Sequence, residues 1–508
     1  MAKIEVNLKK PQGSISKEIF GHFCEHAFKN IYGGIYDPES KNADIDGYRK
    51  DVLEYLIKVN PGILRYPGGN FVSNYHWEDG VGPKKDRKKV FEYAWLTEES
   101  NQFGTIEFIT LCRKIGADPY LCVNMGSGSA EEAMHWVEYC NSNGDTYYAN
   151  LRRSHGFEEP FHVKYWGLGN EMYGEWQLGY KKPETYAESA LEYAKAMKWV
   201  DPGIKLVACG CEQDADWNYT IMKRLSHIVD YLSAHHYSLG WGPFTQDNYL
   251  QNMLIPNYME RQNKLALASA FAASNGNGKQ MKIAWDEWNM FGWRCDNVEE
   301  DSAYTLQNAI VTASVLNMFI RNCNTIGLAN YSTFVNISGA LSVKEDTVLT
   351  RSQYSSFELI SNNTGDTLYN TDVYCDNFSA EEPFNPIMAL PKHGINLYNK
   401  EPSQNRIVTL PYIDAVATMD SKKNCFLSLV NRDPENDIEV EVYLHGGKAA
   451  AVGNEMYTIY NESIKAANTV EHPNTVAISS VPTVNIVGDL FTVNLKKHSV
   501  NLLKIMLE

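Results

Sequence analysis

Two glutamates, Glu171 and Glu287, occupy similar positions in the sequence. Each follows a short apolar run, each is preceded by a polar residue (Asn170 or Asp286), and aromatic residues flank both. A pair of carboxylates can hydrolyse a glycosidic bond, because one protonates the leaving oxygen while the other attacks the anomeric carbon or activates water. Carboxylates about 5 Å apart give retention of configuration, and a wider gap gives inversion. We therefore treat these two residues as the candidate catalytic pair.

A metal centre is the main alternative chemistry, since it needs three convergent His, Asp or Glu ligands. The possible suppliers are His22, His26, His235, His236 and Asp286. The sequence contains no HxH pair on a strand and no HExxH helix, and its Gly-Leu-Gly segment at 167–169 lacks the third glycine of a dinucleotide-binding loop. We therefore expect neither a metal nor a cofactor. His235 and Tyr237 could each hold a carboxylate in place or pack structurally, and both roles stay open.

The elements that must position these residues alternate between short apolar runs and longer stretches of helical periodicity. Helical stretches are clear at Ala130–Cys140 and Thr185–Val200. Eight strand–helix units in succession predict a closed (β/α)₈ barrel, an α/β fold whose active site lies at the carboxyl ends of the strands. Strands four and seven, which precede the two glutamates, face each other across such a barrel. The eight runs are Glu18–Phe23, Gly62–Tyr66, Pro119–Asn124, His162–Gly167, Ile204–Cys209, Tyr231–His235, Lys282–Trp285 and Thr325–Asn330.

Beyond roughly residue 370 the pattern changes to strand-like alternation, which is typical of a β-sandwich. The opening IEVNL is also strand-like, and we expect it to pair with this second domain. The predicted division is therefore residues 16–370 for the barrel and residues 1–15 plus 371–508 for the sandwich. The expected sandwich strands are Ile407–Thr418, Asn424–Val430, Ile438–Leu444, Ala477–Val487 and Leu490–Leu503.

Composition narrows the class of partner. The 508 residues include 46 Lys and Arg against 62 Asp and Glu, a net charge of −16, and 44 % are hydrophobic. This content can fill a large core, while the negative balance argues against a nucleic-acid binder and against docking on an anionic membrane. The N-terminus does not read as a secretory signal, and the ten cysteines are scattered. We expect free thiols and a cytoplasmic location.

Four blocks carry a specific resemblance: RYPGGNFVSNYHWEDGVGP (Arg65–Pro83), NMGSGSAEEAMHWVEYCN (Asn124–Asn141), WGLGNEMYGEWQLGY (Trp166–Tyr180) and WDEWN (Trp285–Asn289). Together they resemble the α-L-arabinofuranosidases of glycoside hydrolase family 51. The resemblance implies a (β/α)₈ barrel with a jelly-roll-like β-sandwich that includes the N-terminal strand. It also implies a cytoplasmic, cofactor-independent, retaining and exo-acting enzyme that acts on arabinofuranosyl-containing oligosaccharides and forms a homo-oligomer, often a hexamer.

The same resemblance implies roles for individual residues. Glu171 would be the general acid/base, and Glu287 would be the nucleophile that forms a covalent arabinosyl-enzyme. Asn170 would hydrogen-bond the sugar 2-hydroxyl, a contact that strengthens in the transition state. The negative charge of Glu287 would raise the pKa of Glu171. The other expected binding residues are Glu25 and Asn70 for hydroxyls, Tyr237 and His235 beside the carboxylates, Trp176 on the leaving-group side, and Gln353 from the last barrel loop.

Some positions depart from the family's pattern. Its usual second Trp, after the nucleophile motif, falls on Phe291, with Trp293 two residues later. Tyr180 stands where a His is common, and no Trp precedes Gln353. These changes leave the arabinan or arabinoxylan origin of the substrate open. Another retaining glycosidase of the same barrel, such as an endoglucanase or a xylosidase, is the alternative, and a non-catalytic carbohydrate-binding protein is a more distant one.

Overall fold

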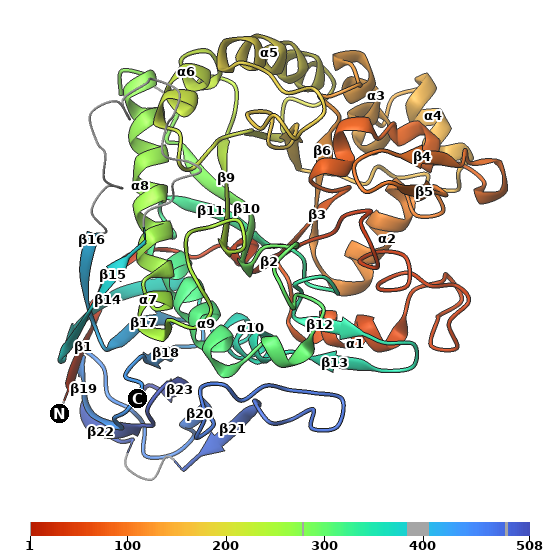
Figure 1. Ribbon diagram of the computed structural model, residues 1–508. Coiled ribbons are helices and arrows are strands. Elements are labelled where there is room, and N and C mark those ends of the chain that lie inside the picture. Colours follow the sequence, from red (N-terminus) through yellow and green to blue (C-terminus); the bar gives the residue numbers. More distant parts are fainter. Residues whose placement is uncertain (1, 277–278, 384–405, 483–485) are drawn as a thin grey trace, which may run out of the picture.

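The computed structural model describes residues 2–276, 279–383, 406–482 and 486–508. Its centre is a closed barrel of eight parallel strands in the order β10-β11-β2-β3-β6-β7-β8-β9 (Figure 1). All eight strands predicted from the sequence are present, so the predicted barrel is confirmed. Their bounds are β2 (Gly21–Phe23), β3 (Ile63–Tyr66), β6 (Asp118–Val123), β7 (Tyr165–Leu168), β8 (Lys205–Ala208), β9 (Tyr231–Leu239), β10 (Lys282–Phe291) and β11 (Ile326–Tyr331).

The barrel strands are apolar because both of their faces are covered. One face packs on the surrounding helices, and the other fills the inside of the barrel. Six strands each supply one residue to a small cluster separate from the main core, namely Ile63, Tyr120, Tyr165, Val207, Ala284 and Leu328. The barrel is thus a packed core whose functional residues can only stand at its ends.

Helices cover the barrel, and local signals fix several of their ends. Ser129 accepts a hydrogen bond from the Glu132 amide at the start of α3 (Ala130–Asn141), and Pro183 begins α5 (Pro183–Val200). The helix α9 (Leu306–Arg321) is buried along nearly its whole length because it also packs against the second domain. The other helices are α1 (Lys50–Lys58), α2 (Thr105–Ile115), α4 (Tyr147–Ser154), α6 (Ala215–Leu225), α7 (Tyr249–Asn252), α8 (Ile255–Ala273) and α10 (Ser352–Ser361).

The second domain is a nine-stranded sheet in the order β21-β20-β23-β18-β17-β14-β1-β19-β22. Its N-terminal strand β1 (Ala2–Ser14) lies between β14 (Thr367–Tyr374) and β19 (Ile438–His445), antiparallel to the first and parallel to the second. Alternate residues of these strands, such as Ile4 and Val442, meet in one apolar cluster, so the sheet curls around a core of its own. The remaining strands are β17 (Ile413–Met419), β18 (Asn424–Asn431), β20 (Glu455–Ile459), β21 (Ile478–Val481), β22 (Leu490–Leu495) and β23 (Ser499–Met506).

Two strands predicted as continuous are interrupted. The run 407–418 divides into β16 (Arg406–Pro411) and β17, and β16 pairs instead with β15 (Asn377–Glu382) in a separate hairpin. The run 490–503 divides into β22 and β23 because His498 adopts a φ of 36°, which turns the chain. Of the run 477–487, β21 covers only four residues, and residues 483–485 lie outside the described part. Among the helices that the structure describes, none has the length and apolar composition needed to cross a bilayer.

Candidate active site

A cavity of about 510 Å³ opens at the carboxyl ends of the barrel strands. Residues from several strand ends line it: Glu25 after β2, Asn70 after β3, Glu171 after β7, Glu212 after β8, His235 and Tyr237 on β9, and Glu287 on β10. Aromatic rings form much of its wall, among them Trp95, Trp176, Trp241 and Trp293. A polar floor with aromatic walls is a setting suited to a sugar ring.

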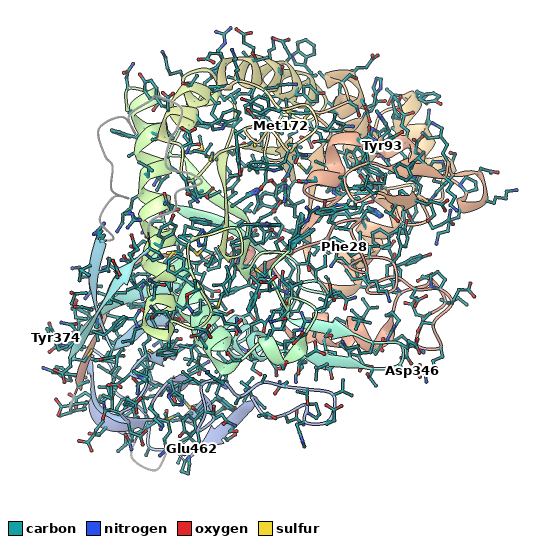
Figure 2. The ribbon with its side chains drawn as sticks, in the orientation of Figure 1. Phe28, Tyr93, Met172, Asp346, Tyr374 and Glu462 are labelled. Carbon is teal, nitrogen blue, oxygen red and sulfur yellow. The ribbon has the colours of Figure 1, made fainter. Side chains whose placement is uncertain are left out.

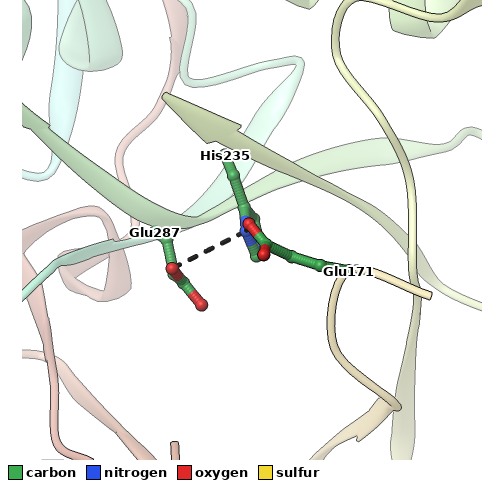
Figure 3. Close-up of side chains that lie close together, drawn as sticks. All are labelled: Glu171, His235 and Glu287. Atoms are coloured by element: carbon green, nitrogen blue, oxygen red, sulfur yellow. Dashed lines mark hydrogen bonds and ion pairs between the residues drawn. The ribbon is translucent and has the colours of Figure 1, made fainter. Parts of the chain in front are cut away.

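The two candidate catalytic glutamates lie close together in this cavity. One oxygen of Glu171, one oxygen of Glu287 and a ring nitrogen of His235 all lie within 4.8 Å of one another (Figure 3). Glu171 reaches the cavity from a turn in which its own φ is 44° and that of Gly169 is 77°. A left-handed backbone at a glutamate is costly, and it is typical of positions where function constrains the chain.

A bulge in β10 explains how two neighbouring acids both face the barrel mouth. Side chains normally alternate along a strand, so Asp286 and Glu287 should point to opposite faces. The pairing of β10 with β9 shifts between Ala284 and Glu287, which adds one residue to β10. Because a bulge re-aims the residues that follow it, Glu287 reaches the cavity while Asp286 stays near the barrel axis.

Two donors hold the Glu287 carboxylate. Arg65 Nη1 donates to Oε1 at 2.7 Å, and the Tyr237 hydroxyl donates to Oε2 at 2.8 Å. The Tyr237 hydroxyl also lies 2.6 Å from Ser332 Oγ, which fixes its position. One charged and one neutral donor therefore fix the orientation of this carboxylate, as a nucleophile requires.

Asp286 forms a second layer under this pair. Its Oδ1 lies 3.0 Å from His235 Nε2, and its Oδ2 accepts a hydrogen bond of 2.9 Å from the Tyr120 hydroxyl. Burial alone would raise the pKa of Asp286, but the charges of Arg65 and His235 lower it below its usual value. Asp286 is therefore a fixed negative charge behind the His235 ring.

The charges around the cavity favour a proton on His235 rather than on Glu171. Burial works against a charged imidazole, yet the negative charges of Glu287 and Asp286 raise the pKa of His235 well above its usual value. Burial raises the pKa of Glu171, but the hydrogen bond and charge of His235, with a 2.8 Å hydrogen bond from Trp176 Nε1, lower it overall. The net rise in the pKa of Glu171 that was expected from Glu287 is therefore not found, because the contacts with His235 and Trp176 lower it. The nearer charge is the cation, with Nδ1 2.9 Å from Glu171 Oε1.

The expected sugar-binding residues converge on Gly69. A Cβ atom at this glycine would lie 3.1 Å from Glu287 Oε1, 3.2 Å from Glu25 Oε2 and 3.4 Å from Asn170 Nδ2. Asn170 is held by Arg65, whose Nη2 donates to its Oδ1 at 2.7 Å. One arginine therefore positions both the expected nucleophile and the amide beside Glu171.

Glu25 differs from Glu171 in having a raised pKa. Burial, and then the negative charge of Glu287, raise its pKa to about 8, although Oε1 accepts hydrogen bonds from the Phe71 amide and Trp95 Nε1, both at 2.9 Å. A neutral carboxyl can both donate to and accept from a hydroxyl, which suits a sugar-binding role.

The leaving-group positions are only partly as expected. Trp176 lines the cavity and is 60 % exposed. Trp293 lines it as well, whereas Phe291 is buried in β10. Gln353 is not brought to the cavity: it is buried in the first turn of α10, where its amide donates to the Gly339 carbonyl. Sequence order placed this glutamine near the last barrel strand, but the helix turns its side chain into the protein.

Several cavity residues gave little or no signal in the sequence. Arg65 stands in a quoted motif but received no role, and Asp286 was considered only as a metal ligand. Trp95, Trp241 and Glu212 were not singled out. Glu212 is buried beside His235, whose backbone amide lies 3.3 Å from its Oε2, and burial raises its pKa. Trp95, Trp241 and Glu212 lie in loops after or between strands, where sequence periodicity carries no information, whereas Arg65 and Asp286 lie within β3 and β10.

The cluster of Glu171, His235 and Glu287 also has the donor types of a divalent metal site. It is the one such group among the residues that the structure describes, and of the five suppliers considered from the sequence only His235 belongs to it. A ligating imidazole nitrogen must be unprotonated, whereas the raised pKa of His235 favours a proton on both nitrogens. The charge balance therefore favours a hydrogen-bonded carboxylate pair.

Comparison with known proteins gives a consistent result. Residues 55–252 match the family model of the α-L-arabinofuranosidase 1 domain, and residues 286–499 match that of the α-L-arabinofuranosidase C-terminal domain. A probable α-L-arabinofuranosidase C of Aspergillus clavatus is 36 % identical over 92 % of this chain and 90 % of its own length. An intracellular exo-α-(1→5)-L-arabinofuranosidase of Bacillus subtilis is 30 % identical over 94 % of both.

Solved structures agree. The arabinose complex of the Thermotoga maritima α-L-arabinofuranosidase superposes with a TM-score of 0.87 at 37 % identity, covering 99 % of this chain and 100 % of the other. The family 51 enzyme of Thermotoga petrophila gives the same values. A glucanase-xylanase from a metagenome library, at 14 % identity and a TM-score of 0.62, shares the fold alone.

Proposed function

The chain belongs to the α-L-arabinofuranosidases of glycoside hydrolase family 51, and from this premise we propose that it releases terminal arabinofuranosyl residues from arabino-oligosaccharides with retention of configuration. One observation carries the proposal: oxygens of Glu171 and Glu287 lie within 4.8 Å of each other at the floor of one cavity. Retaining glycosidases hold their carboxyl groups about 5 Å apart, whereas inverting enzymes leave room for a water.

In the first step Glu287 attacks the anomeric carbon and the glycosidic C–O bond breaks. Arg65 and Tyr237 donate hydrogen bonds to the two oxygens of Glu287 and orient it towards the sugar. Glu171 gives a proton to the leaving oxygen, and the product is an arabinosyl ester of Glu287. In the second step Glu171, now ionised, takes a proton from the water that cleaves this ester.

The proton for the first step comes through His235. In the free enzyme it lies between Nδ1 of His235 and Oε1 of Glu171, 2.9 Å apart. As negative charge develops on the leaving oxygen, the proton moves to that oxygen through Glu171, and His235 becomes neutral. Asp286 keeps the ring in place throughout, because it holds the opposite nitrogen.

The sugar lies where Gly69 leaves space between Glu25, Asn170 and Glu287. In the proposed complex, Glu25, Asn70 and Asn170 bind its hydroxyls, and the contact of Asn170 strengthens in the transition state. We place the leaving group beside Trp176, whose Nε1 donates to Glu171, and beside Trp95 and Trp293, which line the same cavity. Gln353 has no part in this proposal, since its amide is engaged inside the fold.

The domain division, assembly and location belong to the same proposal. We assign catalysis to residues 16–370 and a supporting role to residues 1–15 with 371–508. The pairing of β1 with β14 and β19 supports this division. A homohexamer is proposed from the family resemblance alone. A cytoplasmic location is supported by the intracellular relative from Bacillus subtilis.

A panel of 4-nitrophenyl glycosides tests the activity. We expect hydrolysis of the α-L-arabinofuranoside and at least about 100-fold lower kcat/KM for the β-D-xylopyranoside and β-D-glucopyranoside, because the wrong ring leaves buried polar groups unpaired. Proton NMR of the first-formed product should show the α-anomer, and EDTA should leave the rate unchanged. Preference for a pyranoside would support the alternative glycosidases of the same barrel.

A further inference from the structure

A small hairpin next to the cavity is held by features that its own strands do not explain. Strands β4 (Val90–Glu92) and β5 (Thr97–Glu99) pair only with each other among the described residues. The hairpin lies beside the barrel (Figure 1), and Figure 2 marks Tyr93 in its exposed loop. Since an isolated two-stranded hairpin is marginally stable in water, other contacts must hold it.

Glu92 fixes the loop of this hairpin. Its side chain is buried, and its two oxygens accept hydrogen bonds from the main-chain amides of Ala94, at 2.7 Å, and Trp95, at 2.6 Å. A carboxylate that binds two successive amides restricts the loop to one conformation. That conformation determines where the Trp95 side chain begins.

Glu99 fixes the base of the hairpin. Its Oε2 lies 3.0 Å from His26 Nδ1, and its Oε1 accepts a 2.6 Å hydrogen bond from the Tyr32 hydroxyl. Both members of the Glu99–His26 pair are buried. His26 directly follows Glu25 in the chain, so the hairpin is fastened to the segment that carries a proposed sugar-binding carboxyl.

Trp95 is the residue that this framework places. Its Nε1 donates to Glu25 Oε1 at 2.9 Å, and its ring stacks on Trp293 with centroids 5.4 Å apart. The exposed ring of Phe28 also packs against Trp95, with the two ring centroids 5.1 Å apart. Trp95 and Trp293 both line the cavity, so a shift of the hairpin would change the cavity wall.

We propose that Glu92 and Glu99 are positioning residues that hold Trp95 in the cavity wall and thereby set the affinity for the leaving-group sugar. They act through Trp95 and do not touch the reacting atoms. The inference rests on the proposed arabinofuranosidase activity. Leaving-group recognition then depends on the buried carboxylates Glu92 and Glu99, which lie outside the cavity, as well as on the ring of Trp95 that lines it.

The hairpin offers a matched control. Glu98 lies between these two positions in the register but points to solvent, with a side chain 70 % exposed and an ion pair to exposed Lys89. Such surface pairs contribute little to stability. Glu98→Gln therefore makes the same chemical change on the same hairpin without removing a buried contact.

The test compares α-(1→5)-arabinobiose with methyl α-L-arabinofuranoside, whose leaving group has no ring to contact Trp95. We expect the ratio of kcat/KM for arabinobiose to that for the methyl glycoside to fall about tenfold in Glu92→Gln and in Glu99→Gln, since each loses a charged hydrogen bond. The fall should come through KM for arabinobiose. Glu98→Gln should keep the wild-type ratio, and Glu99→Asp should recover part of it.

An equal loss on both substrates, or an unchanged ratio in both variants, would overturn the inference. Wild-type enzyme in the same assay separates failure of the hairpin's role from failure of the proposed activity. If wild type cleaves neither substrate, the result counts against the activity itself. Glu92→Gln removes only contacts to the loop amides, so it decides the question if Glu99→Gln does not fold.

Discussion

Nδ1 of His235 lies 2.9 Å from Oε1 of Glu171, and Nε2 of the same ring lies 3.0 Å from Asp286. The imidazole thus joins a carboxylate that must carry a proton during catalysis to one whose pKa Arg65 and His235 hold below its usual value. This relationship explains how Glu171 can act as an acid although its own pKa is lowered.

Replacing His235 should impair protonation of the leaving group. In His235→Asn we expect kcat/KM for methyl α-L-arabinofuranoside to fall about 100-fold, and that for the 2,4-dinitrophenyl glycoside to fall much less, because dinitrophenolate leaves without a proton. The matched control is His236→Asn. Burial lowers the pKa of His236 to about 3, and its Nε2 lies 2.9 Å from Ser238 Oγ, away from the carboxylates. Equal losses on both substrates would contradict the role.

Replacing Arg65 by lysine should impair catalysis even though the positive charge is kept. Its guanidinium reaches Glu287 and Asn170 at the same time, each at 2.7 Å, and a single ammonium cannot. We expect kcat of Arg65→Lys to fall about 100-fold, because the nucleophile is no longer held in its reactive orientation. Arg152 is equally buried but donates to main-chain carbonyls, so Arg152→Lys should lower the melting temperature while kcat stays near wild type. Similar kcat values for the two variants would refute the assignment.

Gly69→Ala should weaken sugar binding. The backbone angles of Gly69, φ −86° and ψ −99°, lie outside the regions that alanine prefers, and the new methyl group would lie 3.1 Å from Glu287 Oε1. We expect KM to rise about tenfold, the cost of a crowded contact of 1–2 kcal/mol. Gly144→Ala, whose methyl group would meet its nearest neighbour at an ordinary 3.4 Å, serves as the control. A wild-type KM in Gly69→Ala would place the sugar elsewhere.

The pH profile should report Glu25. Its pKa of about 8 means that it is neutral below pH 8 and ionised above it, where a second negative charge then stands near Glu287. We expect kcat/KM to decline above about pH 8 in wild type. Glu25→Gln mimics the neutral form at every pH, so its alkaline limb should move to higher pH. An identical alkaline limb in wild type and Glu25→Gln would show that another group controls it.

The barrel could be predicted because its strands are short, fully buried and separated by helices of regular periodicity. The same regularity put Glu171 and Glu287 at strand ends, and the structure brings both into one cavity. The pairing of β1 with the second domain could also be predicted, because this strand precedes the first barrel strand. Its exact neighbours were not, because β14 and β19 are distant in sequence and one pairs parallel.

The supporting residues were out of reach for two physical reasons. Arg65 reads as part of a buried strand, and only closure of the barrel brings it to Glu287. Asp286 and Glu287 are adjacent in the sequence, and only the β10 bulge lets Glu287 reach the cavity while Asp286 contacts Tyr120 and His235. Trp95 lies on a hairpin whose stability depends on buried carboxylates rather than on a strand pattern. The Glu171 pKa depends on one distance to His235, which no sequence pattern contains.

The most direct test of the two-carboxylate mechanism is hydrolysis of 4-nitrophenyl α-L-arabinofuranoside by wild type, Glu171→Ala and Glu287→Ala, with and without azide. We predict that both variants lose activity and that azide rescues Glu171→Ala with the α-arabinosyl azide as product, because azide intercepts a β-linked glycosyl-enzyme. Rescue of Glu287→Ala should give the inverted β-azide. Full activity of either variant without azide, or the same azide anomer from both, would contradict the assignment of Glu171 as acid/base and Glu287 as nucleophile.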